Sequence, residues 1–160
     1  MGVSTPPFKV SQQEAYAHSG YQGEAARKLF MNSGIKSRHF YFQNGIRTDE
    51  DSDELNRRYV RGALEIGCRA VRKCLESADL NAQDIDLFVL CTSTGYTCPD
   101  IGSRLIGHMG FRSEVQRAPI VGLGCGGAVP SLQRACDFAQ SHVGQIALVV
   151  TVEICSACYY

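Results

Sequence analysis

The chain has 160 residues, 44% of them hydrophobic, which is enough for one domain with a sizeable core. Sixteen basic residues balance sixteen acidic ones, which excludes an overall positive field that would gather a nucleic acid or an anionic membrane by charge alone. The longest apolar run, residues 146–152, is far shorter than the ~20 residues that cross a bilayer, and residues 1–6 lack an export or lipidation pattern. We therefore expect a soluble, cytoplasmic protein that binds neither nucleic acid nor membrane.

The first helix is predicted over residues 11–32. Ser11 is placed as its N-cap, Glu14 three residues later completes a capping box, and Gly34 follows its end. Residues 35–42 are basic at their start and aromatic at their end, which indicates a short strand or an extended loop before a turn-like pair at residues 44–45.

A long helix is predicted next, from about residue 51 to residue 78, because apolar side chains recur there at near-helical spacing. After a polar turn at residues 81–84, the apolar run 87–91 is typical of a buried parallel strand. A loop rich in Thr and Ser follows this strand.

The rest of the chain alternates between predicted helices and predicted strands. Helices are predicted over 100–109 and 128–142, and strands over 118–121 and 145–153. This alternation favours a parallel or mixed sheet covered by helices, with ligands bound at loops beyond the carboxyl ends of the strands.

The eight cysteines are better explained as reduced, mostly buried thiols than as a disulfide framework, because the chain has periodic apolar segments and no export pattern. The C-x-x-C pair formed by Cys155 and Cys158 ends a strand-like run. If that strand continues, the two side chains point to opposite faces and cannot converge on a metal. We therefore expect no metal site.

The segment with the clearest chemistry is VGLGCGGAVP, residues 121–130, which places Cys125 between glycines where a strand turns into a helix. Glycines let other atoms approach the sulfur, and backbone N–H groups at a helix start favour a thiolate. Pro130 is tolerated within the first helical turn. The pattern indicates a nucleophile, and the alternative it leaves open is a small buried cysteine that fills a tight turn.

Three motifs in order resemble those of the type III polyketide synthases, the chalcone-synthase-like family. They are the glycine-rich setting of Cys125, CTSTGYTCPD at residues 91–100, and VEICS at residues 152–156. The likeness also includes residues 36–42, and ICSACYY at residues 154–160 is closer to bacterial members than to plant ones. The resemblance implies a thiolase-like layered α/β/α fold, of which residues 1–160 would be the N-terminal half with the nucleophile.

The resemblance also implies a reaction. Cys125 would attack the thioester of a starter acyl-CoA, and decarboxylation of malonyl-CoA would supply the carbanion that extends the acyl group by Claisen condensation. These two thioesters are the implied substrates, and no further cofactor is implied. A homodimer is implied as well, because Cys98 matches the position from which a loop residue reaches into the partner's cavity; a plain buried thiol is the alternative.

Further site residues are carried over from the family by position. Five would line the cavity that shapes starter size and cyclisation, with ordinary packing near strand ends as the alternative: Ser93, Thr94, Glu153, Cys155 and Cys158. The carboxylate of Glu153 ends an apolar strand and is expensive to bury unpaired, which favours a cavity role for it. Lys36 and Arg38 lie where the family contacts CoA phosphates, although a solvated basic loop explains them equally well.

The family's catalytic histidine and asparagine, which form an oxyanion hole, belong to the second half of the fold. None of the four histidines of this chain lies in that motif: His18, His39, His108 and His142. We therefore expect a chain that accepts an acyl group but condenses poorly alone, and that is a fragment or one part of a longer polypeptide.

Three other functions are compatible with parts of the pattern. A β-ketoacyl-ACP synthase of the initiating type shares the fold and the cysteine, but the glycine-rich setting of Cys125 weighs against it. A non-catalytic half-domain would instead bind a partner chain through its exposed faces. A thiol redox protein would need Cys155 and Cys158 to be exposed and to have a lowered pKa.

Overall fold

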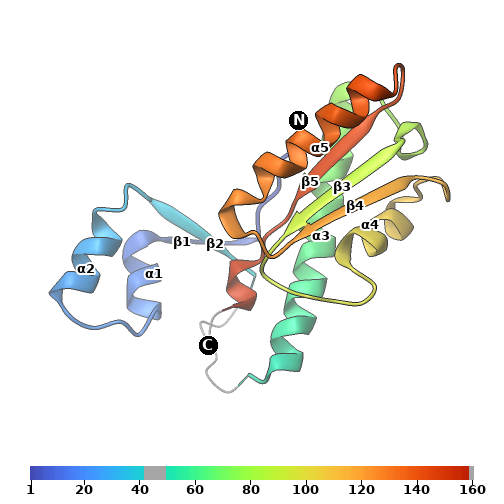
Figure 1. Ribbon diagram of the computed structural model, residues 1–160. Coiled ribbons are helices and arrows are strands. Elements are labelled where there is room, and N and C mark those ends of the chain that lie inside the picture. The colour runs from blue at the N-terminus through green and yellow to red at the C-terminus, as the bar shows by residue number, and fades with distance from the viewer. Residues whose placement is uncertain (42–49, 159–160) are drawn as a thin grey trace.

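The computed structural model describes residues 1–41 and 50–158. The turn predicted at residues 44–45, the end of the segment 35–42 and the last two residues of ICSACYY lie outside this part. Figure 1 shows a layered body around a sheet and a smaller N-terminal arm beside it.

The sheet of the body is parallel and has the strand order β4-β3-β5. Its central strand β3 (Leu87–Thr92) is buried at every position, which explains its uninterrupted apolar sequence. The strands on either side are β4 (Gln116–Val121) and β5 (Ala147–Thr151). The predicted parallel, helix-covered sheet is confirmed, although β5 is shorter than the predicted 145–153.

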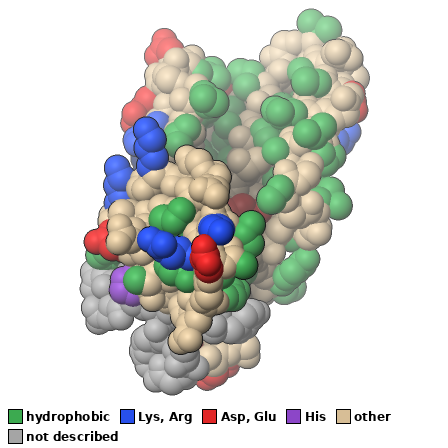
Figure 2. Space-filling view, turned by 90° about the vertical axis from the view of Figure 1, so that its left-hand side faces the viewer, with side chains coloured by type: hydrophobic (Ala, Val, Ile, Leu, Met, Phe, Trp, Pro, Cys, Tyr) green, Lys and Arg blue, Asp and Glu red, His purple; other side chains and the backbone are tan. Residues whose placement is uncertain are grey.

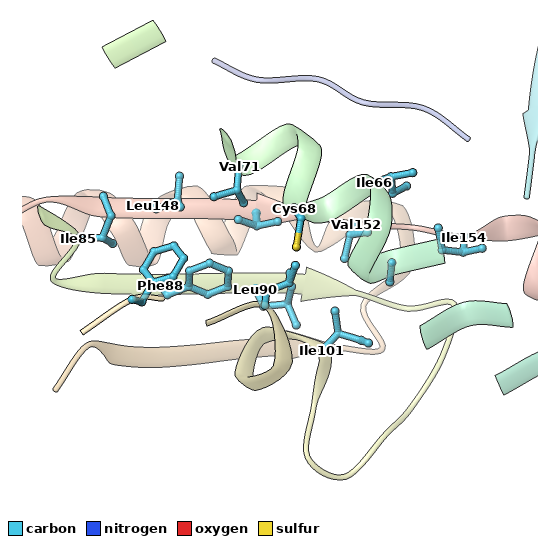
Figure 3. Close-up of a cluster of buried hydrophobic side chains, with 14 of the residues drawn as sticks. Ile66, Cys68, Val71, Ile85, Phe88, Leu90, Ile101, Leu148, Val152 and Ile154 are labelled. Carbon is cyan, nitrogen blue, oxygen red and sulfur yellow. The ribbon is translucent and has the colours of Figure 1, made fainter. Parts of the chain in front are cut away.

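Helices cover both faces of this sheet, which gives three layers (Figure 1). Side chains alternate along β3, so Phe88 and Leu90 pack on one face while Leu87 and Val89 pack on the other. The face with Phe88 and Leu90 is covered by α3 (Ser52–Ala78) and α4 (Ile101–Met109). The face with Leu87 and Val89 is covered by α5 (Ala128–Ser141). Figure 3 shows Phe88 and Leu90 among the buried side chains of the larger cluster.

The predicted helix starts are confirmed by their caps. Asp51 accepts a hydrogen bond from the N–H of Glu54, whose own carboxylate accepts one from the N–H of Asp51, so α3 begins with a complete capping box. Asp100 caps α4 by accepting from the N–H groups of Gly102 and Ser103. None of the described helices is both long and apolar enough to cross a membrane.

The single helix predicted over residues 11–32 is wrong. The chain forms β1 (Phe8–Ser11), α1 (Gln12–His18), α2 (Glu24–Met31) and then β2 (Ser37–Phe40), which pairs antiparallel with β1. Two glycines lie between the helices with φ of +70° and +101°, Gly20 and Gly23, and such backbone cannot continue a right-handed helix.

The capping box predicted for the first helix is nevertheless confirmed, because Ser11 and Glu14 make both of its hydrogen bonds. Gly34 has a φ of +74°, as expected of a glycine that follows a helix end. The two short helices pack on each other through Tyr16 and Phe30, whose ring centroids are 5.2 Å apart. The break therefore lets the segment fold back on itself and build the arm.

All eight thiols are free, and the prediction that most of them are buried is wrong. Only Cys68 and Cys91 are buried, and Cys74 is half-buried. Five cysteines are exposed because they lie in loops at one end of the sheet or on the outer face of α5: Cys98, Cys125, Cys136, Cys155 and Cys158.

Candidate active site

The carboxyl ends of the three parallel strands meet at one edge of the sheet. Thr92, the last residue of β3, pairs with Val121 at the end of β4, and Cys91 pairs with Thr151 at the end of β5. The loops that follow these strands therefore begin side by side, and the start of α5 lies at the same end of the sheet as the C-terminal turn (Figure 1). These loops are where the sequence analysis expects ligands, and ligand binding there stays a prediction.

Cys125 lies in the 3₁₀ turn η2 (Gly124–Gly126), between the end of β4 and the start of α5. Gly122 and Gly124 enter this turn with φ of +80° and +56°, conformations that favour glycine. The turn is closed by a 3.1 Å hydrogen bond from the N–H of Gly127 to the carbonyl of Gly124. The predicted strand–turn–helix setting is confirmed. The alternative of a buried structural thiol is wrong, because Cys125 is exposed.

The turn packs directly on the end of β3. A Cβ atom added at Gly127 would lie 2.5 Å from the sulfur of Cys91, so this position has no room for a side chain. A Cβ at the neighbouring Gly126 would meet nothing within 4 Å. The two glycines after Cys125 thus differ: Gly127 lets α5 approach β3, whereas Gly126 faces open space.

Ser93 connects the loop after β3 to the nucleophile turn. Its hydroxyl oxygen accepts a 2.8 Å hydrogen bond from the N–H of Gly124, the residue before Cys125. Ser93 is itself held through its own N–H, which donates to Glu153 at 3.1 Å. A continuous set of hydrogen bonds therefore runs from Glu153 to the residue beside the candidate nucleophile.

Glu153 is the centre of this hydrogen-bond set. Besides the bond from Ser93, its Oε2 accepts a 3.0 Å bond from the N–H of Thr94 and a 2.7 Å bond from the Thr94 hydroxyl. The Oγ1 of Thr94 in turn accepts a 2.8 Å bond from the N–H of Ile154. The Oε2 atom of the Glu153 carboxylate thus accepts three hydrogen bonds, and the carboxylate joins the loops after β3 and β5.

Cys155 and Cys158 do not continue the strand, so the assumption that placed them on opposite faces is wrong. β5 ends at Thr151, and Cys155 begins the 3₁₀ turn η3 (Cys155–Ala157). Residues three apart in such a turn lie nearly above each other. The sulfur of Cys158 donates to the carbonyl of Thr94 at 3.4 Å. Within residues 1–41 and 50–158, no group of three or more His, Cys, Asp or Glu is arranged to hold a metal ion.

Cys155 and Cys158 have raised pKa values, whereas a redox pair needs a lowered thiol pKa. Both reach solvent, yet neighbouring atoms crowd each sulfur, and this partial burial raises the pKa of Cys155 and of Cys158. The charge of Glu153 raises both pKa values further. Cys125 is also near enough for its charge to contribute to the raised pKa of Cys155. A pair with raised pKa values is a poor thiol-exchange centre.

A cavity of about 290 Å³ opens beside this hydrogen-bond set. Three of the predicted cavity residues line it: Ser93, Thr94 and Cys158. Glu153 does not line the cavity, but its carboxylate holds the lining residues Ser93 and Thr94 through hydrogen bonds. Cys125 and Cys155 do not line the cavity. The predicted site residues therefore lie at the same end of the sheet but do not all belong to one cavity wall.

The sequence analysis did not predict the other seven residues that line this cavity, among them Asn56, Tyr59 and Tyr96. Tyr59 is buried, and its hydroxyl forms a 2.9 Å hydrogen bond with Oγ1 of Thr92 at the end of β3. Burial raises the pKa of the Tyr59 phenol. Tyr59 lies on the apolar face of α3, so the sequence pattern suggested an ordinary core residue. Its hydroxyl group on an otherwise apolar helix face was the one signal that could have indicated a role in the cavity.

Cys98 lies apart from this cavity. It is exposed, precedes the cis peptide bond to Pro99, and lines a second cavity of about 520 Å³ between α3, α4 and the loop after β3. The buried-thiol alternative is therefore wrong for this chain. Its contact with a partner subunit stays a prediction.

Lys36 and Arg38 belong to the arm, at the start of β2. Nε of Arg38 donates to the side chain of Gln12 at 2.8 Å, and its guanidinium carbon lies 5.7 Å from the centre of the Phe30 ring. Arg38 is thus engaged in holding the arm together, whereas Lys36 is exposed. Figure 2, which faces the arm, shows basic side chains beside acidic ones rather than a uniform basic surface.

Comparison with known proteins agrees with this geometry. A family model described as FAE1/Type III polyketide synthase-like protein matches residues 8–160. The chain is 30% identical to the 1,3,6,8-tetrahydroxynaphthalene synthase of Streptomyces coelicolor, over 98% of this chain and 44% of that protein. It is 28% identical to the 3,5-dihydroxyphenylacetyl-CoA synthase of Streptomyces toyocaensis, over 99% of this chain and 42% of that protein.

Solved structures give the same result. The crystal structure of the Streptomyces coelicolor tetrahydroxynaphthalene synthase, a bacterial type III polyketide synthase, matches with a TM-score of 0.89 and 28% identity, over 99% of this chain and 48% of that one. The C-terminal type III polyketide synthase domain of Steely1 from Dictyostelium matches with a TM-score of 0.85 and 26% identity, over 98% and 47%. The chain therefore spans less than half the length of these relatives.

Proposed function

The chain belongs to the FAE1/type III polyketide synthase-like family, with the thiolase-like layered α/β/α fold of its N-terminal half, and we propose that Cys125 accepts an acyl group from a CoA thioester. The observation that carries this proposal is the placement of Cys125. It is exposed, it lies in a tight glycine turn before α5, and the residue before it is held by Ser93.

The proposed acylation is a thioester exchange. The Cys125 thiolate attacks the thioester carbonyl carbon, a new carbon–sulfur bond forms at Sγ, and the bond to the CoA sulfur breaks. The departing CoA thiolate takes up a proton. In the proposed extension, malonyl-CoA loses carbon dioxide and its carbanion attacks the acyl carbonyl. A carbon–carbon bond then forms and the Cys125 thiolate is released.

The neighbouring residues have positioning and shaping roles in this proposal. Ser93 holds the nucleophile turn, and Glu153 holds Ser93 and Thr94. The cavity of about 290 Å³ beside them, with Cys158 in its wall, accommodates part of the acyl chain. Cys155, close to Cys125 in space, borders the path between the sulfur and this cavity.

The substrates need no further cofactor in this proposal, because the thioester supplies the activated carbonyl and the leaving carboxylate supplies the carbanion. Lys36 and Arg38 contact CoA phosphates in this proposal, since the bond from Nε of Arg38 to Gln12 leaves its terminal nitrogens able to donate. Cys98 reaches toward a second copy in a homodimer, as the exposed position of its loop allows.

Residues 1–160 act in this proposal as the N-terminal, nucleophile-carrying half of a longer enzyme. The support is that the chain covers 42% and 44% of the two curated relatives. The histidine and asparagine that polarise the thioester carbonyl belong to the other half. This chain alone is therefore acylated, whereas efficient condensation requires the remaining residues.

Acylation is tested by incubating the chain with short, long and aromatic acyl-CoAs, followed by intact-mass and peptide mass spectrometry. We expect one adduct, on Cys125, that the Cys125→Ala variant lacks and the Cys136→Ala variant keeps. Cys136 is the matched control because it is exposed but lies on α5, away from the strand ends. Equal labelling of Cys125 and Cys136, or no adduct even on a longer polypeptide that supplies the histidine and asparagine, would overturn the proposal.

The comparisons favour this function over a β-ketoacyl-ACP synthase, because the matching family model and relatives are type III polyketide synthases. The same labelling experiment addresses the non-catalytic half-domain, which predicts no acyl adduct on Cys125.

A further inference from the structure

The short turn η3 lies beside the candidate active site and carries two of its thiols. Cys155 is near enough to Cys125 for their charges to interact, and Cys158 lines the cavity of about 290 Å³. A 3₁₀ turn of three residues has poor hydrogen-bond geometry, so it holds its position only weakly by itself. The position of both thiols therefore depends on the contacts that the turn makes with other elements.

Ser156, which lies between the two thiols in the sequence, makes two such contacts. Its hydroxyl oxygen accepts a 3.0 Å hydrogen bond from the N–H of Tyr41, the residue that follows β2. Its carbonyl accepts a 2.9 Å bond from a terminal nitrogen of Arg58 on α3. Ser156 is buried, and in Figure 1 the turn lies between the end of β2 and α3. The arm, α3 and the turn are thus joined at one residue.

Arg58 supplies a donor that the backbone of the turn does not. The carbonyls of residues 154 and 155 accept bonds from the N–H groups three residues later. The carbonyl of Ser156 is the next one along the turn, and its donor is the guanidinium of Arg58. One helical turn beyond Arg58, a Cβ atom added at Gly62 would lie 3.1 Å from the side chain of Ile154. The helix therefore packs closely on this segment at the place where Arg58 bonds to it.

Glu50 holds the guanidinium of Arg58 in this orientation. The other terminal nitrogen of Arg58 pairs with Glu50, and the two side chains are only 12% and 9% exposed. A second pair on the same helix, Arg69 with Glu65, is 41% and 46% exposed. A buried guanidinium is expensive unless its donors are used, and a charged hydrogen bond is stronger in surroundings of low dielectric constant. Arg58 therefore holds the turn by a charge-assisted bond from which water is largely excluded.

We propose that Arg58 is a positioning residue of the candidate active site. Through the carbonyl of Ser156 it fixes η3, and with it the places of Cys155 and Cys158 relative to Cys125. The turn then presents a fixed wall to the acyl group, so that acyl-CoAs are distinguished by the shape of the group they carry. The effect on the acyl group rests on the proposed acylation, whereas the effect on the two thiols of the turn does not.

The position of the turn is tested by alkylation with iodoacetamide at a fixed pH, followed for each cysteine by peptide mass spectrometry. In Arg58→Met, which keeps a long side chain without a donor, Cys155 and Cys158 should react about tenfold faster than in the wild type, the shift expected when a charged hydrogen bond is lost. Arg58→Lys keeps a charged donor and should restore most of the protection. Arg69→Met is the matched control, because Arg69 is paired with Glu65 on the same helix, about three helical turns further along, and its loss should leave both rates unchanged.

Two buried thiols separate local loosening of the turn from unfolding. Cys68 on α3 and Cys91 on β3 are buried, so they react only when the body opens, and their rates should stay at the wild-type value in Arg58→Met. Glu50→Gln is a milder change that weakens the hold on Arg58, and it should raise the rates of the two turn thiols by a smaller factor, so it decides the question if Arg58→Met does not fold. The positioning role is overturned if the turn thiols keep their wild-type rates, if Cys68 and Cys91 accelerate equally, or if Arg69→Met has the same effect.

The second readout concerns the acyl group. With short, long and aromatic acyl-CoAs, the rates of adduct formation at Cys125 should differ among substrates in the wild type and differ less in Arg58→Met, because the wall is no longer fixed. Arg58→Lys should recover the selectivity. Equal selectivity of Arg58→Met and the wild type would overturn the role in discrimination. If the wild type forms no adduct at all, the proposed acylation fails, and the alkylation rates still decide whether Arg58 positions the turn.

Discussion

The hydroxyl oxygen of Ser93 lies 2.8 Å from the backbone nitrogen of Gly124 and accepts its hydrogen bond. The two residues are 31 positions apart in the sequence, yet this bond connects the loop after β3 to the turn that presents Cys125. Since Glu153 holds the N–H of Ser93, the orientation of the nucleophile turn depends on all three strand ends.

We expect Ser93→Ala to loosen the nucleophile turn, because the Gly124 N–H loses its acceptor, at a cost of about 0.5–1.5 kcal/mol in the free energy of unfolding. The acylation rate of Cys125 should fall, and Ser93→Thr, which keeps a hydroxyl, should restore most of it. Urea unfolding and the rate of adduct formation measure the two effects. An acylation rate that is unchanged in Ser93→Ala would show that this bond does not position Cys125.

Alanine substitutions at the two glycines after Cys125 should differ sharply. In Gly127→Ala the new methyl group meets the sulfur of Cys91 at 2.5 Å, and we expect a loss of about 1–3 kcal/mol in stability, as for other overpacked sites. Gly126→Ala meets no atom within 4 Å and should unfold at nearly the wild-type denaturant concentration. Equal stability of the two variants would contradict the close packing of α5 on β3.

Cys155 and Cys158 should react slowly with iodoacetamide at neutral pH. Partial burial raises their pKa values, so less thiolate is present than in an unhindered cysteine, whose pKa is about 8.5. Their alkylation rates, followed by peptide mass spectrometry, should rise at a more alkaline pH than that of a free cysteine peptide. Rapid alkylation below neutral pH would instead revive the redox function.

Asp86 should make stability depend on pH in the acidic range. Its carboxylate accepts the N–H of Ile146 and is paired with Arg112, and these contacts, led by the bond from Ile146, lower its pKa in the folded state. A lowered folded pKa means that the stabilisation is complete above the unfolded value, about 3.9, and is lost as the pH falls through the lower folded value.

Thermal melts of Asp86→Asn and the wild type should therefore differ most near neutral pH and converge as the pH drops below about 4. Asp137→Asn, at an exposed position of α5, serves as the control for removing a surface carboxylate. A difference between Asp86→Asn and the wild type that stays constant with pH would show that the ionised carboxylate does not stabilise the fold.

The sequence by itself determined the features that depend on near neighbours along the chain. Apolar periodicity located α3, a continuous apolar run located β3, and the capping box at Ser11 located one helix start, because each relies on residues near one another along the chain. The glycines around Cys125 indicated a tight turn between strand and helix for the same reason. The break between α1 and α2 was missed because neither Gly20 nor Gly23 alone excludes a helix; their positive φ angles do.

Only the tertiary structure decided which distant residues meet. Parallel pairing of β3 with β4 and β5 brings the segments after Thr92, Val121 and Thr151 to one edge, and this creates the bonds among Ser93, Gly124 and Glu153. Residues of α3 and α4 likewise line one cavity only because both helices cover one face of the sheet. Strand register and helix packing are set by the whole core, so no local pattern along the chain contains them.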